Sequence, residues 1–237
     1  MSEVALWRRL LAELLGSLFL AAVVIGSGIA AQRLSPGNTG LELLENAAAT
    51  AAGLYAIILM FGPVSGGHFN PVVSAADAAF GGLSWRDAAA YGPAQVAGCI
   101  AGAVLANLMF ALPAVSISAK DRASAAHFLS EIIATLGLIV VIFALARSGR
   151  PQATPAAVGA YIGAAYFFTS STSFANPAVT IARTLSNTFA GIRPSSVPGF
   201  VIAQLGGLVL AVAAIVVLYP HIEEHAAALV LPQEAAP

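Results

Sequence analysis

Residues 161–183 of the chain read YIGAAYFFTSSTSFANPAVTIAR, and the rest of the sequence is organised around the Asn-Pro-Ala step at 176–178. An asparagine followed by proline predicts a helix start, because asparagine is a preferred N-cap residue and proline is tolerated at the first helical position. The surroundings are apolar, since no charged residue lies between Arg150 and Arg183. Irregular polar backbone at membrane depth is tolerated only where protein buries it or where it lines a water-filled cavity. The stretch is therefore a candidate pore wall.

The composition limits the class of protein. Of the 237 residues, 59% are hydrophobic and only 9% are charged, and the mean hydropathy is +0.86, whereas a soluble domain carries about 25% charged residues. We therefore expect an integral membrane protein. The net charge of −1 gives no reason to expect nucleic acid as a partner. The single cysteine, Cys99, can form no internal disulfide and says nothing of the redox compartment.

Apolar stretches predict six membrane spans, since about 20 helical residues cross the roughly 30 Å of hydrocarbon in a bilayer. The stretches of suitable length are 10–31, 44–64, 88–112, 124–146, 154–172 and 196–219. The first is too long for the core of a signal peptide, so we expect it to be retained. Gly98 and Gly102 in the third have the small-xxx-small spacing that permits close helix packing within the bundle.

Two shorter helices are expected between these spans. A second Asn-Pro step occurs in residues 65–74, SGGHFNPVVS, and paired interrupted segments in corresponding places indicate an inverted-repeat membrane protein. The segments at the two steps, 70–83 and 176–190, each cover about half a bilayer at about 1.5 Å per residue. Two half-helices that enter from opposite faces and meet at the midplane fit both lengths.

The predicted fold is an all-α membrane protein with six transmembrane helices and two re-entrant half-helices. Residues 1–115 form the first inverted repeat and residues 116–220 the second, each with three spans and one half-helix. Residues 221–237 are expected to be a mobile C-terminal tail. The tail holds His221 and His225, for which a metal site is a less favoured interpretation than a solvated segment.

The two Asn-Pro motifs carry a resemblance to a known family. Two Asn-Pro-Ala-type motifs, the first preceded by Ser-Gly-x-His and each followed by a short apolar helix, resemble the major intrinsic protein family, the aquaporins and aquaglyceroporins. The resemblance runs from about residue 9 to about residue 220. It implies a multi-pass channel of the inner (plasma) membrane with cytoplasmic termini, assembled as a homotetramer. The basic residues divide evenly between the two sides, so the positive-inside rule does not choose the orientation.

Asn70 and Asn176 are expected at the midplane of the pore, together with Val72 and Ala178 of the same motifs. The helix macrodipole places partial positive charge at each N-terminus, and the two carboxamides offer N–H donors to a passing solute. A water or a hydroxyl must then point its oxygen at them, which opposes proton relay and cation passage. The alternative is that both asparagines are ordinary N-caps of core helices. Val72 stands where alanine is usual in the family.

Two carboxylates and one imidazole accompany these motifs. Glu13 and Glu131 lie deep in spans, where carboxylates are costly unless they have partners. A proton relay is one interpretation; the resemblance implies instead that they accept hydrogen bonds from the two re-entrant loops, and their symmetric placement favours this supporting role. The resemblance also places His68 in the pore on the cytoplasmic side, and a packing histidine is the alternative.

The predicted selectivity filter departs from the family. Counted from the two asparagines, the four filter positions of the family fall on Thr50, Ala164, Ser173 and Val179. Val179 replaces the arginine that is usual three residues after the second asparagine, and no aromatic residue or histidine occupies the other positions. The counts to Thr50 and Ala164 cross a whole loop, so a slip of one residue would select a neighbour. Loss of the guanidinium predicts a wider and less polar pore.

Two charged residues occupy equivalent places in the half-helices. Arg183 lies seven residues after Asn176, on the face of Val179, and Asp77 lies seven residues after Asn70. We expect Arg183 near the outer mouth of the pore and Asp77 near the inner mouth. The equally favoured alternative is that both cap helices or pair with loop groups.

These features predict a passive channel for small uncharged solutes: glycerol-like polyols, metalloid hydroxides such as arsenous acid, and water. The missing filter arginine resembles a bacterial branch of the family that is encoded with arsenic-resistance functions. A secondary transporter with a midplane site and a mainly water-selective aquaporin are the alternatives. We expect no cofactor, no metal and no catalytic residue, because no nucleophile with a base in reach and no cluster of metal ligands can be read from the sequence. An enzyme is therefore not predicted.

Overall fold

The computed structural model describes residues 4–219, which form helices and connecting turns with no strand among them. The α-helices are α1 (Leu6–Leu34), α2 (Thr39–Ser65), α3 (Pro71–Ala79), α4 (Trp85–Met109), α5 (Ala125–Arg147), α6 (Thr154–Phe168), α7 (Pro177–Ala182) and α8 (Val197–Leu218). This confirms the expected all-α class. The predicted mobility and metal site of the C-terminal tail lie outside the described residues.

Among the described helices, α1, α2, α4, α5 and α8 are long and apolar enough to cross a membrane. α6 has 15 residues, about 22 Å of helix, and follows a 3-10 turn at Pro151–Ala153. The prediction that its span reaches residue 172 is wrong. The chain leaves the helix at Thr169, whose backbone is extended. Thr172 and Ser173 further along have positive φ angles, and Glu131 accepts the N–H groups of Phe174 and Ala175, so this segment is a loop.

α3 and α7 are both shorter than the segments 70–83 and 176–190 that the sequence predicts. α3 ends shortly before Gly81, which has a left-handed backbone (φ +83°) that most residues avoid. After α7 the chain tightens into a 3-10 turn, and the carbonyl oxygens of Thr184 and Leu185 accept hydrogen bonds from the connection between α4 and α5. Tertiary partners therefore end the second half-helix early.

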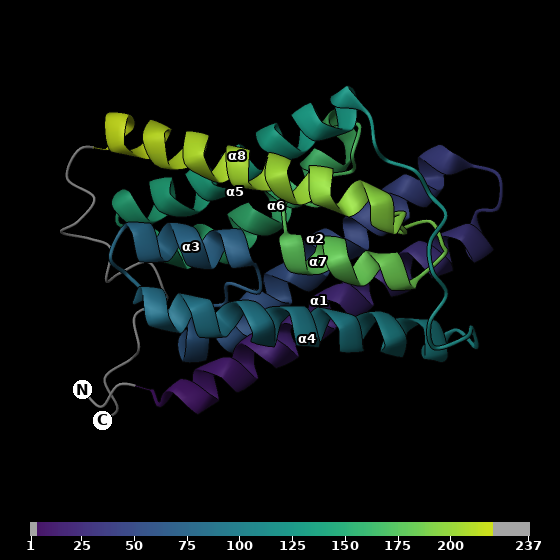
Figure 1. Cartoon of the computed structure of the whole chain (residues 1–237), viewed down its shortest axis with the longest axis horizontal. Helices are drawn as coiled ribbons and strands as arrows, with labels where there is room; N and C mark the ends of the chain where they lie inside the picture. Colours follow the sequence, from purple (N-terminus) through teal and green to yellow (C-terminus); the bar gives the residue numbers. More distant parts are fainter. Residues whose placement is uncertain (1–3, 220–237) are drawn as a thin grey trace.

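The long helices enclose the two short ones. α1 packs against α4 and α2, α2 packs against α6, α6 against α5, and α5 against α8. α3 and α7 each contact both α4 and α8 and so close the ring, and Figure 1 shows them roughly end to end between these two helices. The same figure shows that α1 begins and α8 ends at the same end of the molecule.

Glycines let the helices approach closely at equivalent places in the two halves. A Cβ atom on Gly98 of α4 would collide with the carbonyl oxygen of Leu14 in α1, and one on Gly102 with that of Leu18. In the second half, a Cβ atom on Gly207 of α8 would lie 2.6 Å from the carbonyl oxygen of Ile132 in α5. The predicted close packing at Gly98 and Gly102 is therefore confirmed.

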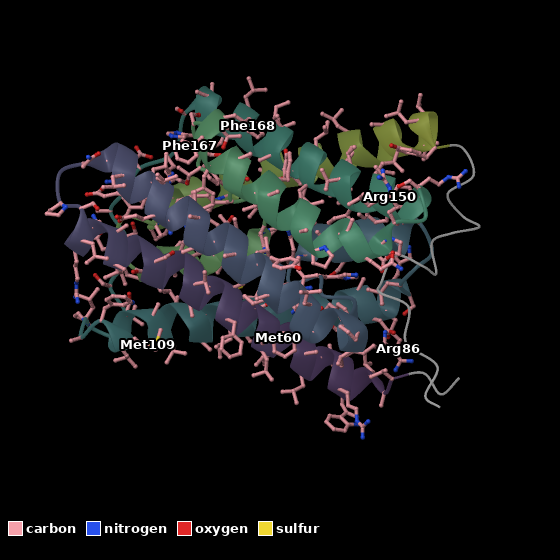
Figure 2. All side chains as sticks on the ribbon, turned by 180° about the vertical axis from the view of Figure 1, so that it is seen from behind. Met60, Arg86, Met109, Arg150, Phe167 and Phe168 are labelled. Atoms are coloured by element: carbon pink, nitrogen blue, oxygen red, sulfur yellow. The ribbon has the colours of Figure 1, made fainter. Side chains whose placement is uncertain are left out.

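The outer flanks of the bundle are apolar. Met60, Met109, Phe167 and Phe168 are each more than half exposed, and Figure 2 shows these four side chains along the sides of the molecule. Side chains of this kind are stable there when lipid surrounds them. Together with the apolar helices, they make this an integral membrane protein.

Candidate functional site: a cavity at the meeting point of two half-helices

Each asparagine of the two motifs caps the half-helix that follows it. The side-chain oxygen of Asn70 accepts a hydrogen bond from the N–H of Val72 at 3.1 Å. That of Asn176 accepts from the N–H groups of Ala178 and Val179 at 2.9 and 3.3 Å. The backbone of both asparagines is extended and proline occupies the first turn, as the motif predicts.

The same two side chains also join the two motifs to each other. Asn70 Nδ2 donates to the carbonyl oxygen of Ala175 at 2.7 Å, and Asn176 Nδ2 donates to that of Phe69 at 2.8 Å. An amide NH₂ group has two donor hydrogens, so each carboxamide keeps one that this reciprocal pair does not use. Both residues line the cavity, where that hydrogen can meet a solute.

The loop residues before each asparagine have unusual backbone angles. Phe69 and Ala175 have φ angles of +49° and +47°, and Ser173 has +49°. Such conformations cost about 1–3 kcal/mol each in non-glycine residues and persist only where the surroundings impose them. Two buried carboxylates provide those surroundings.

Glu13 of α1 is buried and binds the first loop. Its Oε1 accepts from His68 N–H at 3.0 Å and from the Ser65 hydroxyl at 2.6 Å. Its Oε2 accepts from Phe69 N–H and from Gln95 Nε2, both at 2.7 Å. Backbone N–H groups in strained loops thus find a charged acceptor, which makes a stronger hydrogen bond than a neutral one.

Glu131 of α5 makes the matching contacts in the second half. It accepts from the N–H groups of Phe174 and Ala175 at 2.9 Å each, and from Gln204 Nε2 at 2.6 Å. Gln204 also donates to the Thr180 hydroxyl, four residues after Asn176. Both carboxylates face loop backbone, and the described residues that line the cavity do not include them.

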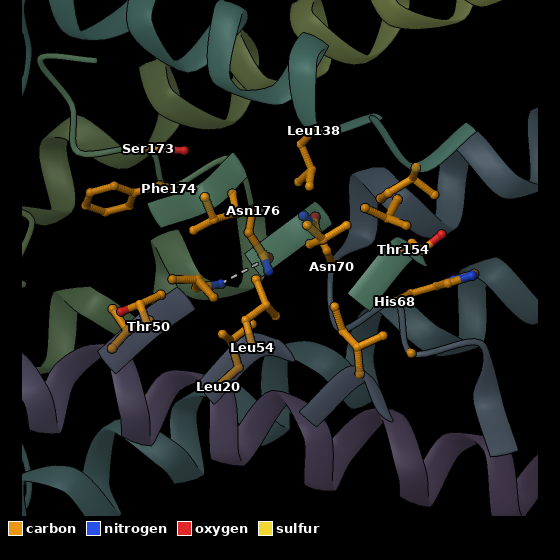
Figure 3. Close-up of a pocket in the computed structure, with 18 of the residues that line it drawn as sticks. Leu20, Thr50, Leu54, His68, Asn70, Leu138, Thr154, Ser173, Phe174 and Asn176 are labelled. Carbon is orange, nitrogen blue, oxygen red and sulfur yellow. Dashed lines mark hydrogen bonds between the residues drawn. The ribbon is translucent and has the colours of Figure 1, made fainter. Parts of the chain in front are cut away.

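A cavity runs past the two asparagines and is lined by helices of both halves, as Figure 3 shows. Its polar lining residues are Thr50, His68, Asn70, Asp77, Thr154, Tyr166, Ser173, Asn176 and Arg183. Most of the remaining lining is aliphatic, from α1, α2, α5 and α6. In Figure 3, Thr50 and Phe174 lie at one end, the two asparagines in the middle, and His68 and Thr154 at the other. We call these the Thr50 end and the His68 end.

At the Thr50 end, the hydroxyl oxygens of Thr50 and Tyr166 lie 3.1 Å apart. Val179 is buried and lines the cavity. Arg183 also lines it, although only 2% of the residue is exposed. Its Nε donates to the carbonyl oxygen of Ala190, and its Cζ lies 3.4 Å from the centre of the Phe174 ring. Arg183 therefore contacts a loop carbonyl and belongs to the cavity wall, and its place at an outer mouth stays a prediction.

Three predicted pore residues lie elsewhere. Ala164 is exposed on the outer side of α6. Ile162 and Tyr166, two residues before and after it, line the cavity. Because two residues turn a helix by about 200°, Ala164 points away from the cavity. Val72 packs with apolar residues of α5 and α8, and Ala178 is fully buried in the main core. None of the three belongs to the described cavity wall, since Ala164 lies on the outer side of α6 and Val72 and Ala178 lie on faces of the half-helices that pack against other helices.

Sequence reasoning missed Tyr166, Phe174 and Thr154. Tyr166 continues the four-residue spacing of Val158 and Ile162 along one face of α6, and this periodicity was a signal that could have found it. No comparable signal marks Phe174 or Thr154, since the first lies in a strained loop and the second begins a helix.

At the His68 end, His68 and Asp77 form a buried pair. The distance from His68 Nε2 to Asp77 Oδ2 is 3.4 Å, and His68 Nδ1 lies 3.0 Å from the Ser74 hydroxyl. The described residues hold no group of three or more histidine, cysteine or acidic side chains that could bind a metal ion.

Two capped half-helices that meet inside a ring of membrane spans, beside a cavity with spaced polar groups, define a membrane channel. A family model described as "MIP: Major intrinsic protein" matches residues 1–175. The aquaglyceroporin AqpS of Rhizobium meliloti (strain 1021) is 53% identical over 213 residues, which are 90% of this chain and 91% of that protein. This chain belongs to the major intrinsic protein family.

Two further comparisons agree with the family. The probable aquaporin NIP7-1 of Arabidopsis thaliana is 33% identical over 146 residues, 61% of this chain and 51% of that protein. The X-ray structure of the aquaglyceroporin from Plasmodium falciparum superposes with a TM-score of 0.70 at 18% identity, covering 93% of this chain and all of that one. At that identity the likeness shows the fold alone.

Proposed function

We propose that the protein is a passive channel for small uncharged solutes. The main solutes are glycerol-like polyols and metalloid hydroxides such as arsenous acid, and water also passes. The observation that carries the proposal is the cavity beside Asn70 and Asn176, where two carboxamides keep donors free between aliphatic walls. Solute oxygens can bind the donors while carbon-bound hydrogens face the aliphatic side.

The side chains at the Thr50 end favour the proposal that solutes larger than water pass through the cavity. Val179 contributes only an aliphatic side chain to this end of the cavity, and we propose Thr50, Tyr166, Ser173, Val179 and Arg183 as its constriction. The name of the R. meliloti relative, an aquaglyceroporin, supports the same class of solute. Arg183 supplies a cation one turn beyond the family's filter position, held against Phe174 and Ala190.

The arrangement around the pore is a further part of the proposal. We propose that Asn70 and Asn176 orient the solute and that Glu13 and Glu131 hold the two loops in their strained conformations. His68 and Asp77 face the inner mouth, and Arg183 faces the outer mouth. We also propose a homotetramer in the inner membrane with cytoplasmic termini, as the family resemblance implies.

Stopped-flow light scattering with proteoliposomes tests the proposal. Separate gradients of glycerol, urea, arsenous acid and an impermeant osmolyte give the permeability to each solute and to water. We expect glycerol permeability well above the protein-free lipid, linear in the gradient and unchanged by proton or sodium gradients. Saturable flux driven by an ion gradient would indicate a secondary transporter, and water flux alone would indicate a water-selective channel.

A further inference from the structure

The His68 end of the cavity holds two polar atoms without partners. Asp77 of α3 is 3% exposed and lines the cavity. Its Oδ2 faces His68, but within the described chain its Oδ1 accepts no hydrogen bond. Thr154, at the start of α6, also lines the cavity, and its buried hydroxyl likewise has no partner there. Figure 3 shows Thr154 and His68 at the same end of the cavity.

Unpaired buried polar atoms of this kind require an explanation. More than about 90% of buried polar groups in proteins have a hydrogen-bond partner, from protein or from water. His68 cannot supply the missing donor, because its Nε2 faces Asp77 Oδ2 and its Nδ1 faces Ser74. Because both residues line the cavity, the contents of the cavity are the available source of partners.

We propose that Asp77 and Thr154 form a solute-binding subsite that accepts hydrogen bonds from the hydroxyl groups of a neutral, polyhydroxylated solute. The proposal rests on the proposed function. An ionised carboxylate only accepts hydrogen bonds, whereas the carboxamides of Asn70 and Asn176 present donors. One hydroxyl oxygen of such a solute can therefore accept a hydrogen bond from an asparagine, while another hydroxyl donates a hydrogen bond to Asp77. The pairing selects molecules with several hydroxyl groups and disfavours anions at this end.

The subsite also joins the two halves of the chain. Asp77 comes from the half-helix of the first half, and Thr154 comes from the second half, through α6. The subsite is not repeated at the other end of the cavity. Asp77 lies seven residues after Asn70, and the residue seven positions after Asn176 is Arg183. One end of the cavity thus offers an acceptor and the other a cation, although the backbone repeats.

Proteoliposomes with the full chain test the subsite through the ratio of glycerol to water permeability. The variants are Asp77→Asn, which replaces a carboxylate oxygen by an amide donor, and Thr154→Val, which removes the hydroxyl at nearly constant shape. Asp87→Asn is the matched control, because this carboxylate pairs with Arg9 at 2.6 Å and does not line the cavity. Water permeability of each variant reports folding and insertion.

We expect Thr154→Val to lower the ratio about threefold to tenfold, the range of one lost neutral hydrogen bond, and Asp77→Asn to lower it by about tenfold or more, the range for a hydrogen bond to a charged group. Asp87→Asn should leave it unchanged. The subsite is overturned if the native protein conducts glycerol and neither Asp77→Asn nor Thr154→Val changes the ratio by twofold. If Asp77→Asn fails to insert, Thr154→Val decides by itself. A native protein that conducts no glycerol contradicts the proposed function instead.

Discussion

Val179 determines which chemical group the half-helix α7 contributes to the Thr50 end. The side chain is buried beside the cavity, and Arg183 follows it by one turn. The guanidinium of Arg183 therefore lies at this end, against the carbonyl oxygen of Ala190 and the ring of Phe174. Position 179 itself carries no charge. The cavity is wider at Val179 than it would be with a guanidinium there.

Val179→Arg should suppress glycerol permeability more than water permeability, by about tenfold, which corresponds to a barrier of about 1.4 kcal/mol. The added side chain narrows the passage, and its charge lies near that of Arg183. Val179→Leu adds volume without charge and serves as the control. Stopped-flow scattering measures both fluxes, and an unchanged flux ratio in an inserted Val179→Arg protein would sink this interpretation of the constriction.

Ser173 offers a second residue-scale test, because it lines the cavity while Cys99 is buried between helices. We expect mercurials to inhibit the native protein weakly. Ser173→Cys should make water and glycerol flux sensitive, since a bound mercury ion would lie in the passage. Ser170→Cys, exposed in the same loop, is the control. Strong inhibition of the native protein would instead place Cys99 in contact with the conduit.

At the scale of elements, the helix pairs α1–α4 and α5–α8 show why the two halves resemble each other. Each pair brings a glycine against a backbone carbonyl. Each also carries one buried carboxylate that binds a loop and one buried glutamine that donates to this carboxylate and to a hydroxyl of the half-helix. The loops can keep strained conformations because these packed helices hold the acceptors in place. Close packing of α1 against α4 and of α5 against α8 thus positions the carboxylates that bind the two loops.

Gly98→Ala should destabilise the protein by about 1–3 kcal/mol, the usual cost of overpacking, because its Cβ atom would collide with the carbonyl oxygen of Leu14. Gly92→Ala, in the same helix, has no atom within 4 Å of the new Cβ and is the matched control. The apparent unfolding temperature in detergent measures both. Equal temperatures for the two variants would show that α1 and α4 can separate at little cost.

At the scale of the whole molecule, the two half-helices meet inside a ring of apolar spans. Removing the water shell of a small ion costs on the order of 20 kcal/mol in a low dielectric. The macrodipoles that end at Asn70 and Asn176 add partial positive charge at the same depth. Neither effect depends on the residue at position 179, so we expect cations to be excluded even with valine at this position.

Bilayer recordings under a proton gradient should therefore show no proton or sodium current. Small or singly charged oxyanions are expected to pass slowly, because the helix dipoles and Arg183 attract them, and Arg183→Ala should reduce this passage. Arg193→Ala is a useful control, since Arg193 is an exposed cation that lies 3.9 Å from Asp121. A proton current above the lipid background would mean that two half-helices alone are an insufficient barrier.

The sequence by itself determined much of the fold. Length and apolar pattern predict the spans because a bilayer requires about 20 residues of helix, and the two Asn-Pro steps predict both half-helices because N-capping is a local property. Their C-terminal ends were predicted too late, since loop contacts end α7. Glu13 and Glu131 accept hydrogen bonds from the two loops. That solute permeation depends on these bonds stays a prediction.

Only the tertiary structure decided which side chains face the cavity. Thr50, His68, Asp77, Ser173, Val179 and Arg183 line it as the sequence predicts, whereas Ala164, Val72 and Ala178 do not. A helix places residues around its whole circumference, so a count along the chain does not fix its rotation. That rotation follows from contacts between distant segments, such as the bonds from each asparagine to the opposite loop, 105 and 107 residues away.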